Sequence, residues 1–385
     1  MLNFSFHNPT KIHFGDGQIK MIANEIPTNA NVLVIYGGGS IKHNGVYEQV
    51  VNALTEHTWC EFSGIEPNPS YDTLMKAQAI IAEKNIDYLL AVGGGSVVDG
   101  AKFIAAAALY EGDDSWDILA KQMPVKKALP IGAVLTLPAT GSESNGGSVV
   151  TRDGNKLPFG SPLVRPQFAV LDPKVTLSLS DRQISNGVVD AFIHIMEQYL
   201  TYSVNGKVQD RFAEGLLLTL IEEGPKALLA ENKEDLEIRA NIMWSATMAL
   251  NGLIGAGVPQ DWSTHMIGHE LTGAFGIDHA RTLSIILPAV MKVKRNEKHD
   301  KLVQFAERVW HLTDQDEAVK VSKAIALTED FFQRMKVPTR LSEVGLSKDN
   351  IEGIVQKLEL HGMTQLGENR DITLAVSQQI LELAL

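Results

Sequence analysis

Two stretches within the first 110 residues share one pattern, in which an apolar run ends in glycines and is followed by helix-like sequence. They are "NVLVIYGGGS" (31–40) and "IDYLLAVGGGSVVDGAKFIAAAALY" (86–110), and "PIGAVLTLPAT" (130–140) and "QFAVLDP" (167–173) are further apolar runs. Continuous apolar runs of this length are typical of parallel strands that are buried on both faces. The pattern therefore predicts an α/β layer with a Rossmann-like parallel sheet.

The first residues alternate between apolar and polar positions, with turn residues between two short runs. "FSFH" (4–7) and "KIHFG" (11–15) flank the turn sequence "NPT". This arrangement predicts a hairpin or a pair of edge strands.

The apolar period changes to 3.6 residues after about residue 180, which predicts helices. Ser180 and Gln183 have the spacing of a capping box at the start of the first helix. We place a domain boundary at 171–181 and expect an α/β domain over 1–180 and an all-helical domain over 181–385. The predicted helices cover 181–204, 207–230, 235–255, 262–275, 300–311, 316–335, 347–359 and 372–384.

Composition excludes several classes of partner. The chain has 385 residues and a net charge of -12, which disfavours nucleic acid and anionic membranes.

Its single cysteine, Cys60, allows neither an intrachain disulfide nor a thiolate metal cluster, so a cytoplasmic location fits best. We expect no secretory signal, because the first residues lack a basic start and an apolar core, and no membrane span, because no apolar run reaches about 18 residues.

The two "GGGS" turns are candidate phosphate-binding sites, because glycine lets backbone N–H groups approach an anion at a helix N-terminus. The alternative is a tight turn that needs glycine for its geometry alone. Ser96, Asp99 and Lys102 follow the second turn, which favours phosphate there. The first turn, Gly37–Gly38–Gly39–Ser40, lacks the acid that binds a ribose 2′-hydroxyl and has Lys42 nearby, which suits a 2′-phosphate.

"TLPATGSESN" (136–145) places small hydroxyl residues at the end of a predicted strand. It is either a polar loop with local backbone hydrogen bonds or a loop that lines a cofactor.

Five side chains are candidate metal ligands. Asp190 and His194 stand at i and i+4 in "SNGVVDAFIHIMEQYL", and so share one helix face. "DWSTHMIGHELTGAFGIDHA" (261–280) contributes His265, His269 and His279. A simple Asp–His hydrogen bond is the alternative, and Met266 excludes the H-E-x-x-H peptidase motif. Nitrogen and oxygen donors without sulfur suit Fe²⁺ or Zn²⁺, and a catalytic metal keeps one position open, so not every candidate can be a ligand.

These motifs resemble the iron-containing (group III) alcohol dehydrogenase family nearly end to end. "IEPNPSYDTL", "NGLIGAGVPQDW" and "HGMTQLGENRDITL" are similar to the branch of NADPH-dependent aldehyde reductases and butanol dehydrogenases. The resemblance implies a dinucleotide-binding α/β domain, a helical metal-binding domain and an active site in the cleft between them. It also implies a homodimer, with the N-terminal strand contributing to its interface.

The resemblance assigns roles by position. It implies Asp190, His194, His265 and His279 as ligands of one divalent metal, Fe²⁺ or Zn²⁺, and His269 as an active-site histidine that is not a ligand. The implied NADP(H)-binding positions are Gly37, Gly38, Gly39, Ser40, Lys42, Gly93, Gly94, Gly95, Ser96, Asp99, Thr136, Thr140, Asn145 and Lys156. NAD-preferring members often carry Asp at the position of Gly39.

We therefore expect a metal-dependent aldehyde reductase, or alcohol dehydrogenase, that transfers hydride between nicotinamide C4 and short- or medium-chain aldehydes. His269, directly or by relay, is the expected proton donor. Two alternatives are a non-redox enzyme of the dehydroquinate synthase fold, which binds NAD and a metal, and a non-catalytic sensor. An apolar pocket discriminates one methylene by only about 1–3 kcal/mol, so the sequence names no single aldehyde.

Overall fold

The computed structural model describes residues 1–314 and 316–385, and these form two compact units. The sheet unit comprises His7–Leu179 and Glu234–Thr247. The helical unit comprises Met1–Phe6, Ser180–Lys233 and Met248–Leu385. Each is described below by itself, and the domain ranges 1–180 and 181–385 stay a prediction.

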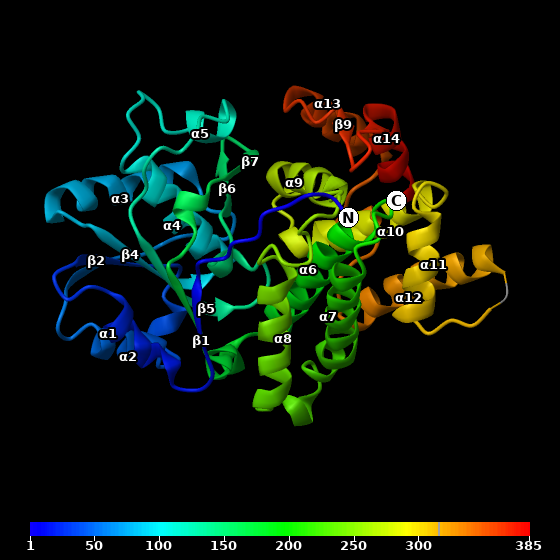
Figure 1. The fold of residues 1–385 in the computed structure, drawn as a ribbon. Helices are drawn as coiled ribbons and strands as arrows, with labels where there is room; N and C mark the ends of the chain where they lie inside the picture. Colours follow the sequence, from blue (N-terminus) through cyan, green and yellow to red (C-terminus); the bar gives the residue numbers. More distant parts are fainter. Residues whose placement is uncertain (315) are drawn as a thin grey trace. The chain divides into compact units, whose positions relative to one another are not determined.

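The sheet unit is built on a parallel six-stranded sheet with strand order β1-β8-β5-β4-β2-β3. Figure 1 labels β1, β2, β4 and β5 of this sheet. The strands are β1 (Lys11–Phe14), β2 (Asn31–Tyr36), β3 (Thr58–Phe62), β4 (Tyr88–Gly94), β5 (Ile131–Leu137) and β8 (Phe168–Leu171). The unit also contains an antiparallel hairpin of β6 (Gly147–Arg152) and β7 (Asn155–Gly160). Its helices are α1 (Ile22–Glu25), α2 (Val46–Ala53), α3 (Tyr71–Lys84), α4 (Gly95–Ala107) and α5 (Asp117–Ala120).

Both faces of the sheet are buried, which is why its strands are continuous apolar runs. In β2, Leu33 and Ile35 pack into a core with α3 and α4, whereas Val32 and Val34 pack into a second core with α1 and α2. The predicted buried strands and the predicted parallel sheet are confirmed.

Helix α8 (Leu236–Ala249) contributes side chains to the sheet unit, although it follows the first helices of the helical unit in sequence. Met243 belongs to the core that contains α3 and α4. The Trp244 ring meets the Phe14 ring edge-on at 5.5 Å, and Thr247 Oγ1 donates to Glu143 Oε1 at 2.6 Å. The sheet unit is therefore completed by a segment from well beyond residue 180.

The helical unit is organised around α6 (Asp181–Tyr199), which is buried along most of its length. A helix that is apolar on all sides belongs in a core. Polar residues in the buried part of α6 are therefore unusual and are candidates for a function. The other helices are α7 (Lys207–Lys226), α9 (Ser263–Phe275), α10 (His279–Val293), α11 (His299–Arg308), α12 (Glu317–Arg334), α13 (Ile351–Leu360) and α14 (Leu374–Leu383). A short antiparallel ladder joins β9 (Gln365–Leu366) and β10 (Ile372–Thr373).

Short 3₁₀ helices complete the secondary structure. They are η1 (Gln18–Met21), η2 (Ser40–Lys42), η3 (Ser142–Ser144), η4 (Pro162–Val164), η5 (Pro173–Ser178), η6 (Ala230–Asn232), η7 (Leu341–Val344) and η8 (Lys348–Asn350). Among the described residues, the search for a helix long and apolar enough to cross a membrane finds none.

The predicted capping box is confirmed, because Ser180 Oγ accepts from the Gln183 N–H and Gln183 Oε1 accepts from the Ser180 N–H. The hairpin predicted at the N-terminus is wrong, and of the alternative pair of edge strands only β1 is present, at the edge of the sheet. β1 pairs in parallel with β8, and residues 1–10 have no regular secondary structure. The long helix α10 and the hairpin β6–β7 were not predicted.

Candidate functional site

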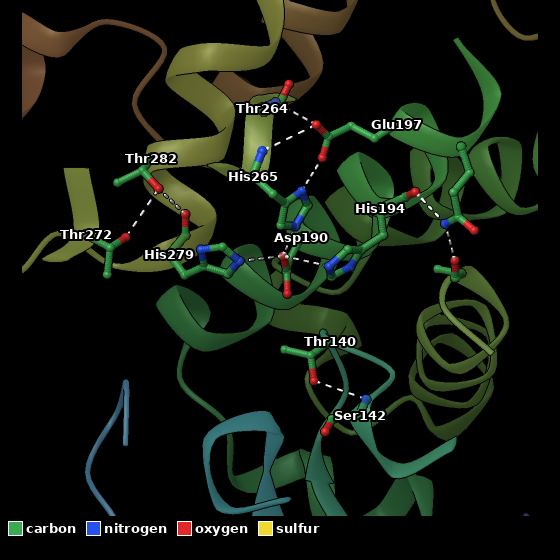
Figure 2. Close-up of polar contacts among 12 residues, drawn as sticks. Thr140, Ser142, Asp190, His194, Glu197, Thr264, His265, Thr272, His279 and Thr282 are labelled. Carbon is green, nitrogen blue, oxygen red and sulfur yellow. Dashed lines mark hydrogen bonds and ion pairs between the residues drawn. The ribbon is translucent and has the colours of Figure 1, made fainter. Parts of the chain in front are cut away.

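The candidate metal ligands come together within the helical unit, on three helices (Figure 2). α6 carries Asp190 and His194, α9 carries His265, and α10 begins at His279. Asp190, His194 and His265 are each at most 4% exposed. Burying a carboxylate among three imidazoles is costly unless a partner compensates its charge.

Local contacts place His279 at this cluster. Asp278, the residue before it, accepts hydrogen bonds from Arg182 Nε at 2.7 Å and from Asn186 Nδ2 at 2.8 Å, and both donors lie on α6. Helices α9 and α10 approach closely at Gly268, where a Cβ would lie 2.8 Å from a methyl carbon of Leu283. The beginning of α10 is thus held near α6 and α9.

The three imidazoles face one carboxylate oxygen. The distance from Nε2 to Asp190 Oδ1 is 3.8 Å for His194 and His265 and 3.7 Å for His279. For metal–ligand bonds of about 2.1 Å, the edges of a tetrahedron are about 3.4 Å, so these spacings are close to those of a coordination shell. The ligand atoms of Asp190, His265 and His279 lie within 4.8 Å of one another, and His194 joins them through its contact with Asp190.

Buried surroundings shift the pKa values of two of these histidines in opposite directions. Burial lowers the pKa of His194 to about 4, which keeps its ring neutral. Burial also opposes a charge on His265, but Glu197 and Asp190 raise the pKa of that ring to about 9. A cation at this position would replace the proton, because a ligating imidazole must be neutral at the ligating nitrogen.

One buried atom supports the fit directly. Within the described residues, His265 Nε2 has no hydrogen-bond partner, although its Nδ1 is bonded to Glu197. A buried polar nitrogen normally has a partner, and a metal would supply one here. Three nitrogens and one oxygen, without sulfur, fit Fe²⁺ or Zn²⁺.

His269 lies beside this cluster, one helical turn after His265. Its ring centroid is 5.1 Å from that of His279 and 6.1 Å from that of His265. It is 4% exposed. The position is compatible with a histidine that acts next to the ligands without being one of them.

Glu197 is a functional candidate that the sequence analysis missed. It is 2% exposed and contacts His265 Nδ1 through Oε2. Its position was a usable signal, because it follows Asp190 by seven residues and therefore lies on the same face of α6.

Further buried charges around α9 were also missed. Lys298 Nζ lies 2.7 Å from Asp261 Oδ2, just before α9, and 2.7 Å from Glu368 Oε1. His361 Nδ1 lies 2.6 Å from Glu270 Oε1, on α9. These pairs fasten the "HGMTQLGENRDITL" segment to the helix that bears the histidines.

In the sheet unit, the second glycine turn joins β4 directly to α4. A Cβ on Gly93 would lie 2.5 Å from Val97 Cγ2, and one on Gly95 would lie 2.4 Å from Thr140 Oγ1. Packing alone therefore requires glycine at these two positions. The first backbone N–H groups of α4 have no acceptor inside the helix. Gly94, the last residue of β4, completes the turn.

A set of buried bonds holds the loop after β5 against α4. Asp99 Oδ1 accepts from Ser142 Oγ at 2.5 Å, and Asp99 Oδ2 accepts from the Val149 N–H at 3.0 Å. Lys102 donates to Ser142 Oγ at 2.7 Å and to Asn145 Oδ1 at 3.1 Å. Burial lowers the pKa of Lys102 to about 8.

Other predicted cofactor positions lie close to that turn. Asn68 links Ser96 and Lys156, because its N–H donates to Ser96 Oγ at 3.3 Å and its Oδ1 accepts from Lys156 Nζ at 3.0 Å. Thr136 is part of β5, and Thr140 Oγ1 accepts from the Ser142 N–H at 3.2 Å. The roles of these residues toward a cofactor stay predictions.

The first glycine turn is open at two of its glycines. A Cβ on Gly38 or Gly39 would meet nothing within 4 Å, whereas one on Gly37 would lie 3.0 Å from the Ile65 carbonyl oxygen. Gly39 has a φ of 90° and caps η2, which begins at Ser40, so backbone conformation favours glycine there.

Lys42 is already engaged near this turn. Its Nζ lies 3.2 Å from Glu61 Oε1, on β3, and 4.6 Å from the centre of the Tyr47 ring. Contacts with Tyr36 and Glu61 raise the pKa of Lys42. Any phosphate at this turn would share the lysine with Glu61.

The comparisons with known proteins cover nearly the whole chain. The model of the family described as iron-containing alcohol dehydrogenase matches residues 9–173, and the model of the C-terminal part of the Fe-containing alcohol dehydrogenase family matches residues 184–384. The chain belongs to the iron-containing alcohol dehydrogenase family.

Two named enzymes are similar to this chain over its whole length. The chain is 57% identical over 388 residues to the NADPH-dependent aldehyde reductase YqhD of Escherichia coli, covering 100% of both proteins. It is 36% identical over 390 residues to the NADH-dependent butanol dehydrogenase A of Clostridium acetobutylicum, covering 100% of this chain and 99% of that one.

Solved structures agree with this membership. The crystal structure of Escherichia coli K-12 YqhD superposes with a TM-score of 0.98 at 56% identity, covering 100% of this chain and 99% of that one. A butanol dehydrogenase A structure from Thermotoga maritima superposes with a TM-score of 0.95 at 37% identity, with the same coverage.

Proposed function

We propose that this protein is a metal-dependent, NADPH-linked aldehyde reductase that also acts as an alcohol dehydrogenase. The observation that carries the proposal is the arrangement of three imidazole Nε2 atoms around Asp190 Oδ1. Its relatives are named as reductases and dehydrogenases, which favours redox chemistry over the non-redox alternative.

Asp190, His194, His265 and His279 would hold the metal, and the two glycine turns of the sheet unit would hold the dinucleotide. When bound, the metal polarises a carbonyl oxygen as a Lewis acid, and the nicotinamide supplies the hydride. His269 would hold and pass the proton that an alcohol product needs, because its ring lies beside that of His279.

NADPH is the proposed cofactor, and the supporting feature is the first glycine turn. No acid occupies positions 37–40, and Ser40 provides a hydroxyl that can donate to a phosphate oxygen. Named relatives include both NADPH-dependent and NADH-dependent enzymes. The cofactor preference of this chain must therefore be measured on this protein.

The experiment that tests the function is NADPH oxidation with butanal, measured on metal-free protein and on protein reconstituted with Fe²⁺ or Zn²⁺. We expect turnover only in the reconstituted samples. A protein that binds NADPH and metal without turnover would be a sensor, and the proposal would fail. Equal turnover in the metal-free sample would show that the reaction does not require the metal.

We also propose a cytoplasmic homodimer, assembled through an apolar surface on the helical unit. Phe4 lies against Gly257, and Met1 Sδ lies 3.2 Å from Gln209 on α7. The N-terminal segment and α7 also carry exposed apolar side chains, Leu2, Phe4, Phe6, Val208 and Phe212, each with at least 47% of its surface exposed. Exposed apolar residues on segments that contact each other are typical of protein interfaces.

Sedimentation equilibrium tests the dimer. The double variant Phe4→Ser/Phe212→Ser should shift the mass toward that of a monomer, because it places hydroxyls in the apolar surface. Leu360→Ser, at a 76% exposed position on α13, is the control and should leave the mass unchanged. A monomeric wild type would contradict the proposal.

A further inference from the structure

Glu197 connects two helices of the candidate metal site. Its Oε2 contacts His265 Nδ1, and its Oε1 accepts from the Thr264 N–H at 2.6 Å and from the His265 N–H at 3.3 Å. Its backbone carbonyl accepts from the Asp261 N–H at 2.8 Å. We propose that Glu197 is a positioning residue, which fixes the tautomer and the ring orientation of His265 so that Nε2 is presented to the metal.

The tautomer follows from donor and acceptor chemistry. A carboxylate only accepts hydrogen bonds, so the nitrogen facing Glu197 must carry hydrogen. A neutral imidazole has one N–H, which leaves the lone pair on Nε2, the atom that lies 3.8 Å from Asp190 Oδ1. A carboxylate behind a ligating histidine also makes that histidine a stronger ligand. The inference concerns the same site as the proposed function and rests on it.

The surroundings of Glu197 keep its carboxylate in place. The first turn of α9 has N–H groups without partners inside the helix, and Glu197 satisfies those of Thr264 and His265. The partial positive charge at a helix N-terminus favours a negative group there. With Asp190 on the same face of α6, one helix provides a direct ligand and also the support for a ligand on α9.

The variant Glu197→Gln separates this role from simple packing. Glutamine has nearly the same shape, and its Oε1 can still accept from the Thr264 N–H. Its amide nitrogen donates, however, so His265 Nδ1 would have to accept and the hydrogen would move to Nε2. That tautomer opposes metal binding, and we expect the affinity for Zn²⁺ or Co²⁺ to fall by about 10–100-fold.

The measurement is competition with a chromophoric chelator on metal-free protein, together with the absorption spectrum of the Co²⁺-saturated variant and the Tm of the metal-free protein. Glu214→Gln is the matched control, because Glu214 is also buried, on α7, and accepts from Tyr199 of α6 at 3.0 Å. We expect a weaker affinity and an altered Co²⁺ spectrum only in Glu197→Gln. Glu197→Asp, which keeps the charge, should recover part of the affinity.

The outcomes distinguish this inference from the proposed function. A wild type that binds metal and reduces butanal, with Glu197→Gln showing the same affinity and spectrum, overturns the inference alone. An equal loss in Glu214→Gln also overturns it, because the effect would then be general destabilisation. A wild type that binds neither Zn²⁺ nor Co²⁺ overturns both.

Discussion

His194 Nε2 lies 3.8 Å from Asp190 Oδ1, one turn further along the same helix. If both are ligands, His194→Ala should lower the metal affinity by at least about tenfold and remove turnover with it. Metal content after dialysis, measured by atomic emission, checks this. His57→Asn is the control, because His57 is a buried histidine of the sheet unit that bonds to the Ile26 carbonyl, and it should retain metal. Full metal and full turnover in His194→Ala would contradict the ligand set.

Replacing His269 should lower the rate of catalysis without lowering the metal content. His269→Ala is expected to keep its metal, while kcat falls by about a hundredfold, a typical loss when a general acid or base is removed. Parallel metal analysis and steady-state kinetics with butanal measure both quantities. A metal loss as large as that of His265→Ala would make His269 a ligand, and an unchanged kcat would leave it without a catalytic role.

Gly39 should govern the choice of cofactor. We expect wild type to prefer NADPH, and Gly39→Asp to shift the preference toward NADH, because a carboxylate would repel a 2′-phosphate and could bind the 2′-hydroxyl. A charge-assisted hydrogen bond to phosphate contributes roughly 1.5–3 kcal/mol, which corresponds to about a tenfold to hundredfold preference. The ratio of kcat/KM for the two cofactors measures it.

The control for that experiment must allow for the backbone at Gly39. Its φ of 90° strains any side chain, so Gly39→Asn is the matched variant: it has the same shape and no charge. Charge repulsion predicts that only Gly39→Asp reverses the ratio. A wild type that prefers NADH, or an equal change in Gly39→Asn, would leave Gly39 with a role in the turn alone.

Asp114 should give the sheet unit an acid-sensitive contribution to stability. Its Oδ2 lies 2.8 Å from Arg152 Nη1, and the hydrogen bond from Arg152 lowers the pKa of Asp114 to about 2. A lowered carboxyl pKa stabilises the fold at all pH values above the unfolded pKa, and this contribution is lost as pH falls from about 4 toward 2. The pair is partly exposed, so we expect only about 1 kcal/mol at pH 7.

The measurement is the difference in the free energy of unfolding between wild type and Asp114→Asn. It should be present at pH 7, shrink below about pH 4 and disappear near pH 2. Comparing the two proteins at each pH cancels the titration of other carboxylates. A difference that is independent of pH would mean that the charge of Asp114 makes no contribution.

Local patterns in the sequence predicted much of the fold but not its long-range pairing. The buried strands and the Ser180 capping box depend on neighbouring residues and were predicted correctly. The N-terminal hairpin was wrong because "KIHF" forms β1, which pairs with β8. That strand is far away in sequence, so the pairing could not be predicted from neighbouring residues. α10 was missed because Pro288 interrupts an already apolar run, although proline there is tolerated inside the helix.

The candidate site shows the same limit. The spacing of Asp190 and His194 placed them together, since both lie on one helix. Which acid stands behind which histidine depends on packing between helices, so the pairing of Glu197 with His265 could not be read from spacing. The partners of Lys42 and Asp99 could not be predicted either. Glu61 and Ser142 belong to other elements, so these pairs also depend on long-range packing.

The path of the chain through the two units has a consequence for synthesis on the ribosome, where N-terminal segments emerge first. When residue 179 has been made, every strand of the six-stranded sheet exists, but Met243, Trp244 and Thr247 do not. The sheet unit must wait for α8, and α6 and α7 emerge in the meantime. Met1–Phe6 precedes the sheet unit in the sequence but belongs to the helical unit, which also includes α9 to α14. Neither unit can therefore be finished as a contiguous nascent fragment, and the apolar N-terminal segment lacks its native contacts until Gln209 and Gly257 have been made.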